Sequence, residues 1–470
     1  MKICKLLLFF ICCISLSAQK KSNISEFDRI ISKHNFSASI VGVEIFNLTD
    51  SQEVFSKNNK ILMRPASNIK ILTTAAGLLF LGADYDFETS LFYDGQITDS
   101  ILIGNVYFKG GFDPSFNLSN LDSLTSLLKI SGIKKIKGNI YADISAMDSL
   151  YWGNGWMWDD QPSVNDPCLT PLCINRNSVR VNYSPEKTGD KVNVKIVPDT
   201  DYFEISNQSV TTNTGKSDLL ISRDWLNHSD KIIVKGNLRR NSGSDSVEFN
   251  VTDMNGYFLS LAEISLKKNG IVFSGNKDTL TTPIEAGLVG KTAKKFSSII
   301  GRMNKQSDNL YAEMTLRALG LKYYGAPSSA EKGLKMIDSL IFLTGKNPKN
   351  YRIADGSGLS HYNLITNELI VSILKYFYYK NPDLYQEFIK SFAVSGTDGT
   401  IKNRLRSELL KGKVFAKTGA ISAVSTISGI VKTKRGKELA FSIFVNNYVG
   451  GAGRARAFQD ELLEYLIINY

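Results

Sequence analysis

Alternating apolar and polar residues near both ends of the chain predict strands of a single sheet. Residues 38–48 alternate, and the stretch 53–55 is expected to form a short partner strand. Two β-rich runs, 424–433 and 438–446, are separated by Lys-Arg-Gly-Lys and predict an antiparallel hairpin. We therefore expect one antiparallel sheet whose strands come from opposite ends of the sequence.

The stretch 63–80, MRPASNIKILTTAAGLLF, is apolar nearly all round after its first turn and predicts a buried helix. That first turn carries Ser67 and Lys70, which share one helix face because they are three residues apart. Serine is a common N-cap, and the Ser-x-x-Lys spacing occurs by chance in many chains. A buried lysine, however, needs a partner or a function.

Helical periodicity returns in the second half of the chain. Residues 296–321 carry two apolar stripes, separated by a polar connection that contains Ser307-Asp308-Asn309. A helix is predicted over 254–270, ending at a glycine, and a C-terminal helix over 454–468. Taken alone, Ser-Asp-Asn is ordinary loop and N-cap chemistry.

The N-terminus predicts export. Lys2 and Lys5 precede an apolar run over 6–16, and small residues follow to Ala18, so we expect a signal peptide over 1–18. This run is too short to span a bilayer, and no other stretch of the sequence predicts a transmembrane anchor. We therefore expect the mature chain to be exported and soluble.

Charge and cysteine content narrow the function classes. The net charge is +11, but the basic residues are spread along the chain, which does not favour a nucleic-acid partner. The three histidines are scattered, so no metal site and no cofactor are predicted. Cys168 and Cys173 follow the signal as a close pair, which predicts a local disulfide in an oxidising compartment; two reduced, buried thiols are the alternative.

Three short motifs occur in one order. Ser67-x-x-Lys70 lies on a predicted helix, Ser307-Asp308-Asn309 on an interhelix loop and Lys417-Thr418-Gly419 on a predicted strand. Each is weak alone, but together they form the motif set of class A β-lactamases and penicillin-binding proteins. The chain resembles the class C low-molecular-mass penicillin-binding proteins, the D-alanyl-D-alanine carboxypeptidase/endopeptidase group typified by penicillin-binding protein 4.

The spacing and further signatures agree with this group. Ser67 and Ser307 are about 240 residues apart, and stretches that look like signatures of the group occur at 110–116, 153–160, 355–360 and 395–400. The resemblance implies an α+β fold: a β-lactamase/transpeptidase-like domain, an antiparallel sheet flanked by helices, split by a large insert with a nested β-rich domain. The expected parts are a catalytic domain (22–87 and 286–470), an inserted domain (88–178 and 251–285) and a nested domain (179–250).

The resemblance also implies roles for individual residues. Ser67 would be the nucleophile that forms an acyl-enzyme, with Lys70 as its base. Ser307 would relay a proton and Asn309 would hold the substrate amide. Lys417, Thr418 and Gly419 would bind the terminal carboxylate, and the backbone of Ala420 would complete an oxyanion hole. Ala420 departs from the serine or threonine often found after Lys-Thr-Gly, so a hydroxyl contact is lost.

The resemblance implies peptidoglycan stem peptides and β-lactam antibiotics as partners, and the periplasm or cell envelope of a bacterium as the location. Asp159 and Asp160, in GWMWDD, are candidates to bind the free amine of a diamino acid in the stem peptide; the alternative is a surface turn with core tryptophans. Two other functions remain open, a β-lactamase and a non-catalytic cell-wall-binding or sensor protein. A β-lactamase needs a separate carboxylate for deacylation, and a mere binder has no need of all five motif residues.

Overall fold

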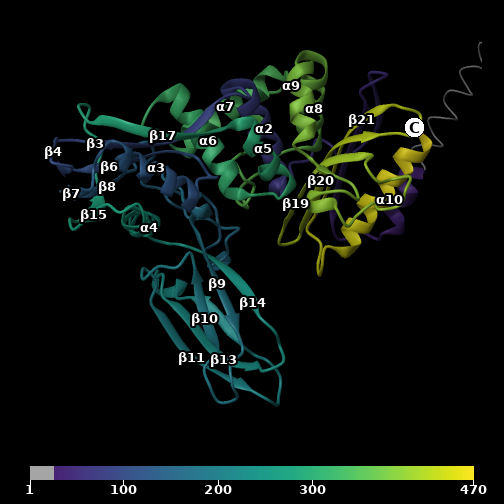
Figure 1. The fold of residues 1–470 in the computed structure, drawn as a ribbon. Coiled ribbons are helices and arrows are strands. Elements are labelled where there is room, and N and C mark those ends of the chain that lie inside the picture. Colours follow the sequence, from purple (N-terminus) through teal and green to yellow (C-terminus); the bar gives the residue numbers. More distant parts are fainter. Residues whose placement is uncertain (1–25) are drawn as a thin grey trace, which may run out of the picture.

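The computed structural model describes residues 26–470, so the predicted signal peptide lies outside the described residues. The main body is built on a six-stranded antiparallel sheet in the order β18-β19-β20-β21-β1-β2. Strand β1 pairs along its length with β21, from Ile40–Asn446 to Asn47–Leu439, so the predicted union of the two chain ends is confirmed (Figure 1). The strands are β1 Ile40–Asn47, β2 Gln52–Lys57, β18 Ala393–Val394, β19 Val414–Ile421, β20 Val424–Lys432 and β21 Glu438–Asn446.

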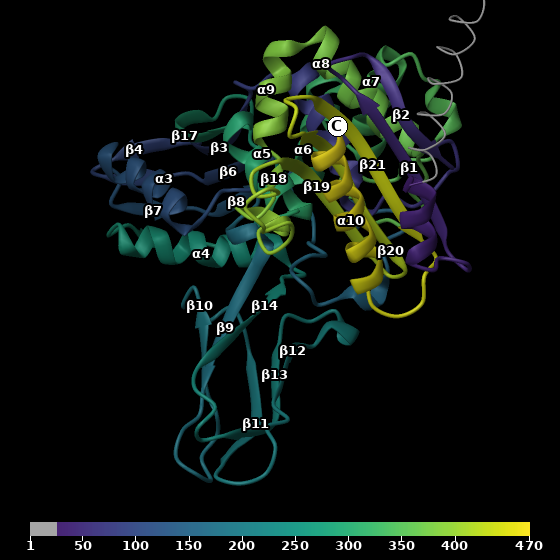
Figure 2. The same ribbon diagram turned by 90° about the vertical axis from the view of Figure 1, so that its right-hand side faces the viewer.

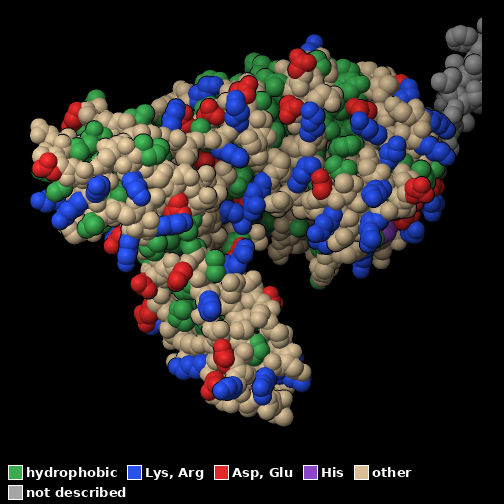
Figure 3. Space-filling view, in the orientation of Figure 1, with side chains coloured by type: hydrophobic (Ala, Val, Ile, Leu, Met, Phe, Trp, Pro, Cys, Tyr) green, Lys and Arg blue, Asp and Glu red, His purple; other side chains and the backbone are tan. Residues whose placement is uncertain are grey.

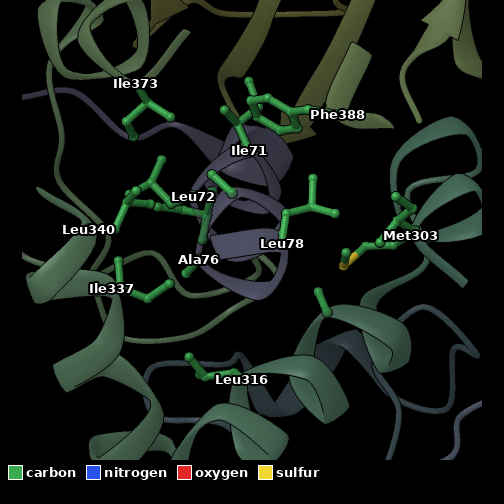
Figure 4. Packing of buried hydrophobic residues seen from close by; sticks show 14 of the residues in the cluster. Ile71, Leu72, Ala76, Leu78, Met303, Leu316, Ile337, Leu340, Ile373 and Phe388 are labelled. Carbon is green, nitrogen blue, oxygen red and sulfur yellow. The ribbon is translucent and has the colours of Figure 1, made fainter. Parts of the chain in front are cut away.

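One face of this sheet is covered by a group of helices, with α2 (Ile69–Ala76) at its centre. Every residue of α2 is buried, and its apolar side chains meet those of the surrounding helices (Figure 4). Gly77 is required where α2 ends, because a Cβ there would lie 2.3 Å from the ring of Phe296. The surrounding helices are α5 Phe296–Lys305, α6 Asn309–Tyr324, α7 Ala330–Leu343, α8 Asn367–Lys380 and α9 Pro382–Lys390.

The opposite face of the sheet has a separate apolar core. Helix α10 (Gly453–Asn469) packs there with the helical residues 26–33, and apolar side chains of β1, β20 and β21 complete the cluster (Figure 2). The sheet is thus buried on both faces, which matches the continuous burial of β20 and β21. No helix in the described part of the chain is long and apolar enough to cross a membrane.

The insert forms two small sheets covered by α3 (Leu118–Ile130) and α4 (Met254–Lys268). We placed residues 287–295 in the catalytic domain, but they form β17, which pairs with β3 in the sheet of the insert. The boundary is wrong there because backbone pairing with β3 carries the returning chain along the insert before α5 begins. The strands are β3 Asp86–Tyr93, β4 Gln96–Thr98, β5 Ile101–Ile103, β6 Val106–Gly111, β7 Lys135–Lys137, β8 Ile140–Asp143, β15 Val272–Phe273, β16 Lys277–Thr279 and β17 Gly287–Lys295.

Residues between the two halves of the insert form a β-rich unit that projects from the rest of the molecule (Figures 1 and 3). It contains two three-stranded sheets, in the orders β10-β9-β14 and β11-β13-β12. The buried Arg223 donates to Asn250 of this unit and to Gln161 of the insert, which fixes the unit to the insert segment that precedes β9. The strands are β9 Ser178–Ser184, β10 Asn193–Val197, β11 Ile205–Thr212, β12 Leu220–Arg223, β13 Ile232–Arg239 and β14 Asp245–Asn250.

Cys168 and Cys173 are both buried and are not joined, so the predicted disulfide is wrong for this structure. The Cys173 thiol packs in the helical core and donates to the carbonyl of Thr170, at 3.2 Å. Burial raises the pKa of Cys168 to about 12 and also raises that of Cys173. Both side chains therefore remain thiols at neutral pH and lack the thiolate that disulfide exchange requires.

A thiol count tests this arrangement. Protein that begins at residue 19 carries only Cys168 and Cys173. After air-exposed purification without reductant, denatured protein should release two thiols to a colorimetric reagent, and native protein should react slowly because both side chains are buried. Finding no free thiol in the denatured sample would instead establish the disulfide.

Candidate active site

Ser67 lies in a single 3-10 turn, Ala66–Asn68 (η1), directly before α2. Two glycines allow neighbouring segments to approach its backbone. A Cβ on Gly358 or on Gly419 would lie 2.9 Å from the Ser67 nitrogen, and the one on Gly358 only 1.9 Å from the Ala66 carbonyl oxygen. The Ser67 amide is thus enclosed by β19 on one side and by the 355–360 loop on the other.

The η1 turn is fixed to the sheet by a side chain that the sequence motifs did not identify. Asn68, fully buried, donates through Nδ2 to the Lys417 carbonyl at 3.2 Å and to Thr426 Oγ1 at 2.7 Å. Thr426 in turn donates to the Pro65 carbonyl at 2.8 Å. The register between the Ser67 turn and the Lys417 strand is therefore set by hydrogen bonds.

Lys70 is completely buried and its ammonium has three acceptors. Nζ donates to Ser67 Oγ at 3.0 Å, to Asn309 Oδ1 at 2.5 Å and to the Ser357 carbonyl at 2.6 Å. Three donors thus meet three acceptors, as an isolated charge in a core requires. The contact with Ser67 Oγ places a potential base against a potential nucleophile.

Lys417 forms a second pair beside the first. Its Nζ donates to Ser307 Oγ at 2.8 Å and to the Thr418 carbonyl at 2.7 Å, and its side chain is fully buried. Ser307 has φ +60°, an uncommon conformation for a residue with a side chain. The structure thus brings together the three sequence motifs from α2, the α5–α6 connection and β19.

Burial shifts the pKa of both lysines. Desolvation lowers the pKa of Lys70 to about 8, although the carboxyl groups of Asp355 and Glu313 act in the opposite direction. Desolvation also lowers the pKa of Lys417 well below its usual value, and the charge of Lys70 lowers it further. The two ammonium groups destabilise each other, which favours a state in which only one of the two lysines is protonated.

Asp355 organises the loop behind Lys70 and was not identified as a functional residue from the sequence. Its buried carboxylate accepts hydrogen bonds from Trp156 Nε1 at 2.9 Å and Asn363 Nδ2 at 2.8 Å. It also accepts from the backbone amides of Gly358 and Ser360, at 2.9 and 2.7 Å. The sequence signature DGSGLS marks the loop that contains Asp355, but the contact of Asp355 with Trp156 of the insert depends on the fold.

A cavity of about 700 Å³ opens in front of these groups. The insert contributes Asn165 to it, and Asn309 Nδ2 donates to the Asn165 carbonyl at 2.6 Å. Asp159 and Asp160 are exposed on a short 3-10 turn, Trp158–Asp160, and do not line this cavity. The predicted residues that do line it are Ser67, Ser307, Asn309, Thr418, Gly419 and Ala420.

A serine that contacts a buried lysine, an adjacent Ser-Asn pair and a second buried lysine on strand β19 define a serine acyl-transferase of the penicillin-recognising class. Comparison with known proteins identifies the family within this class. The chain belongs to the D-Ala-D-Ala carboxypeptidase 3 (S13) family, which matches residues 24–465. The protein is thus a serine-type D-Ala-D-Ala carboxypeptidase by family.

Individual relatives span nearly the whole chain. It is 29% identical over 460 residues to the D-alanyl-D-alanine carboxypeptidase DacB of Haemophilus influenzae, covering 97% of this chain and 95% of the relative. It is 27% identical to a D-alanyl-D-alanine carboxypeptidase of Actinomadura sp. (strain R39), covering 91% and 81%. The crystal structure of penicillin-binding protein 4 from Haemophilus influenzae superimposes with a TM-score of 0.84 at 28% identity, covering 95% and 99% of the two chains. A second crystal structure of that protein, complexed with a β-lactam, gives 0.79.

The pKa of Lys70 predicts the pH dependence of the site. A lysine can accept a proton only when neutral, and its neutral fraction grows as the pH rises through its pKa. The rate of Ser67 acylation by a fluorescent penicillin should therefore rise with pH, with a midpoint of about 8. Thermal unfolding measured at each pH controls for loss of structure, and a midpoint near the ordinary lysine value of about 10.4 would contradict the account.

Proposed function

We propose that the protein is a serine-type D-alanyl-D-alanine carboxypeptidase, with or without DD-endopeptidase activity, that acts on peptidoglycan stem peptides in the cell envelope. The observation that carries this proposal is the contact of the fully buried Lys70 with both Ser67 Oγ and Asn309 Oδ1. If these three side chains were exposed or made no contact with one another, the site would support only the binding of a ligand. The carboxypeptidase relatives and the β-lactam complex of a similar structure support the same chemistry.

Acylation begins with a change in the Ser67–Lys70 hydrogen bond. In the charged form, Lys70 donates to Ser67 Oγ. Once Lys70 is neutral, the bond reverses: the Ser67 hydroxyl donates, Nζ accepts its proton, and Oγ attacks the carbonyl of the D-Ala–D-Ala bond. The oxyanion would receive hydrogen bonds from the backbone amides of Ser67 and Ala420.

The substrate carboxylate helps to make Lys70 neutral. It would be bound by Lys417, Thr418 and Gly419, and an adjacent anion raises the pKa of a lysine. Lys417 then takes a proton, and its positive charge disfavours a second ammonium at Lys70. Substrate binding would thus prepare the base. Ser307 accepts a hydrogen bond from Lys417 Nζ. Its hydroxyl would relay to the leaving amine the proton that Lys70 took from Ser67.

Thr400 supplies a hydroxyl group near the position where Ala420 lacks one. The residue after Lys-Thr-Gly is Ala420, but Thr418 Oγ1 donates to Thr400 Oγ1 at 2.7 Å, and both threonines line the cavity. A carboxylate held by Thr418 would therefore lie within reach of a second hydroxyl. This arrangement supports exopeptidase recognition despite the alanine.

A β-lactamase is the less suitable function for this site. Rapid deacylation needs a carboxylate held over a water molecule, yet no aspartate or glutamate lines the described cavity. The acyl-enzyme formed with a β-lactam should therefore decay slowly. The protein would be inhibited by penicillins rather than resistant to them.

Loss of the nucleophile tests the proposal. A fluorescent penicillin should label wild-type protein covalently, and Ser67→Ala should abolish labelling. The variant should still fold, because Ser67 lines the cavity and water there can replace its hydroxyl as an acceptor for Lys70. Lys70→Ala should slow labelling by about 10²–10⁴-fold, the usual contribution of a positioned base. Labelling that persists in Ser67→Ala would place the nucleophile elsewhere.

The two insert aspartates remain candidates for substrate selection. The Asp160 carbonyl accepts a hydrogen bond from the Ser163 amide at 3.3 Å, at the start of the segment that carries Asn165 to the cavity wall. We therefore assign the cationic amine of the stem peptide to Asp160.

Matched variants of this pair test the assignment. Asp160→Asn should lower kcat/KM several-fold for a stem peptide with a free side-chain amine, since a partly exposed ion pair contributes about 0.2–1 kcal/mol or more when desolvated. Asp159→Asn is the control and should have little effect. Neither variant should alter hydrolysis of an amine-blocked peptide, and equal losses on both substrates would mean that the turn is structural.

A further inference from the structure

A second cavity, of about 620 Å³, lies where the insert meets helices α5 and α6. Its walls come from the turn before α3 (residues 114–118), from residues 175–180, from Pro198 at the end of β10, and from Arg302 and Tyr311. It shares no lining residue with the catalytic cavity. No step of the proposed reaction uses it.

Three arginines line this second cavity. Arg176 and Arg180 come from the segment that starts β9, and Arg302 comes from the last turn of α5. Arg176 has φ +62° within a short 3-10 turn, where the Asn175 nitrogen donates to the Phe116 carbonyl at 2.9 Å. The chain thus adopts an uncommon backbone conformation at the residue that carries this guanidinium into the cavity wall.

Two of these arginines contact the middle residue of the Ser307-Asp308-Asn309 motif. Arg176 Nε and Arg302 Nε both lie 2.8 Å from the same oxygen of Asp308, Oδ2. The side chain of Asp308 is only 2% exposed, and its other oxygen has no hydrogen-bond partner among the described residues. The position of the catalytic loop therefore depends on guanidinium groups that line the second cavity.

The charges at this cavity are not balanced. Among the lining residues, three arginines accompany one carboxylate, Glu248, which accepts from Arg180 and lies 4.0 Å from Arg176 Nη1. Asp308, which does not line the cavity, is shared by Arg176 and Arg302. Arg302 uses only Nε for Asp308, and its guanidinium lies 5.5 Å from the centre of the Tyr311 ring. Terminal guanidinium nitrogens on a wall shared with Phe116, Tyr311 and Pro198 suit an anionic head group attached to an apolar body.

We propose that this second cavity binds a carboxylate-bearing ligand whose head group pairs with the arginines and whose apolar part packs on Phe116 and Tyr311. A carboxylate bound by the terminal guanidinium nitrogens partly neutralises Arg176 and Arg302 and weakens their attraction for Asp308. The ligand thereby loosens the hold on the Ser307–Asn309 loop and slows acylation of Ser67. The slower acylation of Ser67 rests on the proposed function, whereas binding of the ligand does not.

Binding is tested first, with the catalytic cavity blocked by benzylpenicillin. N-acetyl-D-glutamate and inorganic phosphate are titrated separately into the acylated protein, and binding is measured by ligand-observed NMR. We expect N-acetyl-D-glutamate to bind, with a Kd raised about tenfold by Arg180→Gln, which removes one charged donor, and unchanged by Arg240→Gln on the exposed end of the same β-rich unit. Absent binding, or equal binding to both variants, would overturn the site, and phosphate binding as tightly would overturn the carboxylate assignment.

Coupling is tested by the rate of labelling with a fluorescent penicillin. Saturating N-acetyl-D-glutamate should slow labelling several-fold in wild-type protein and in Arg240→Gln, and Arg180→Gln should need about tenfold more of it. An unchanged rate at saturation would refute the link through Asp308. Should the protein fail to label at all, the proposed function fails instead, and binding to Ser67→Ala still reports on the cavity.

Discussion

The burial of two lysine side chains next to each other is the constraint on which this structure depends. Removing an ammonium from water costs several kcal/mol, so Lys70 and Lys417 are tolerable in the core only with complete hydrogen bonding or with a proton removed. The structure provides both: acceptors surround Lys70, and burial lowers the pKa of each lysine. The same arrangement that makes the fold possible lowers the pKa of Lys70 to about 8, which would suit the role of base that we propose for it.

This constraint explains why distant segments converge on α2. The acceptors of Lys70 come from the α5–α6 connection and from the 355–360 loop, while Asn68 binds the strand that carries Lys417. The insert takes part as well, through Trp156 and Asn165. A domain that interrupts the catalytic fold is thus also a wall of its cleft, so changes in the insert can reach the chemistry without any change in the motifs.

Much of this organisation could be predicted from the sequence. Periodicity predicted the buried helix after Ser67, the hairpin β20–β21 and the C-terminal helix, because each pattern is local. The order and type of the three motifs predicted which residues the structure would bring together. Asn68 and Thr426 were not identified because their partners are far away in the sequence, and Asp355 was not identified because its contact with Trp156 of the insert depends on the fold. Two predictions were wrong. The end of the insert was misplaced because it depends on the pairing of β17 with β3, and the disulfide was not found because both thiols are buried separately.

We propose that Ser67 and Lys70 cleave the D-Ala–D-Ala bond through an acyl-enzyme. This reaction can be measured by incubating the purified protein with monomeric and cross-linked muropeptides and analysing the products by mass spectrometry. We expect loss of one terminal D-alanine from monomers, with or without separation of cross-linked dimers, and no reaction with Ser67→Ala. Unchanged muropeptides in the wild-type reaction, or products that still form with the alanine variant, would contradict it.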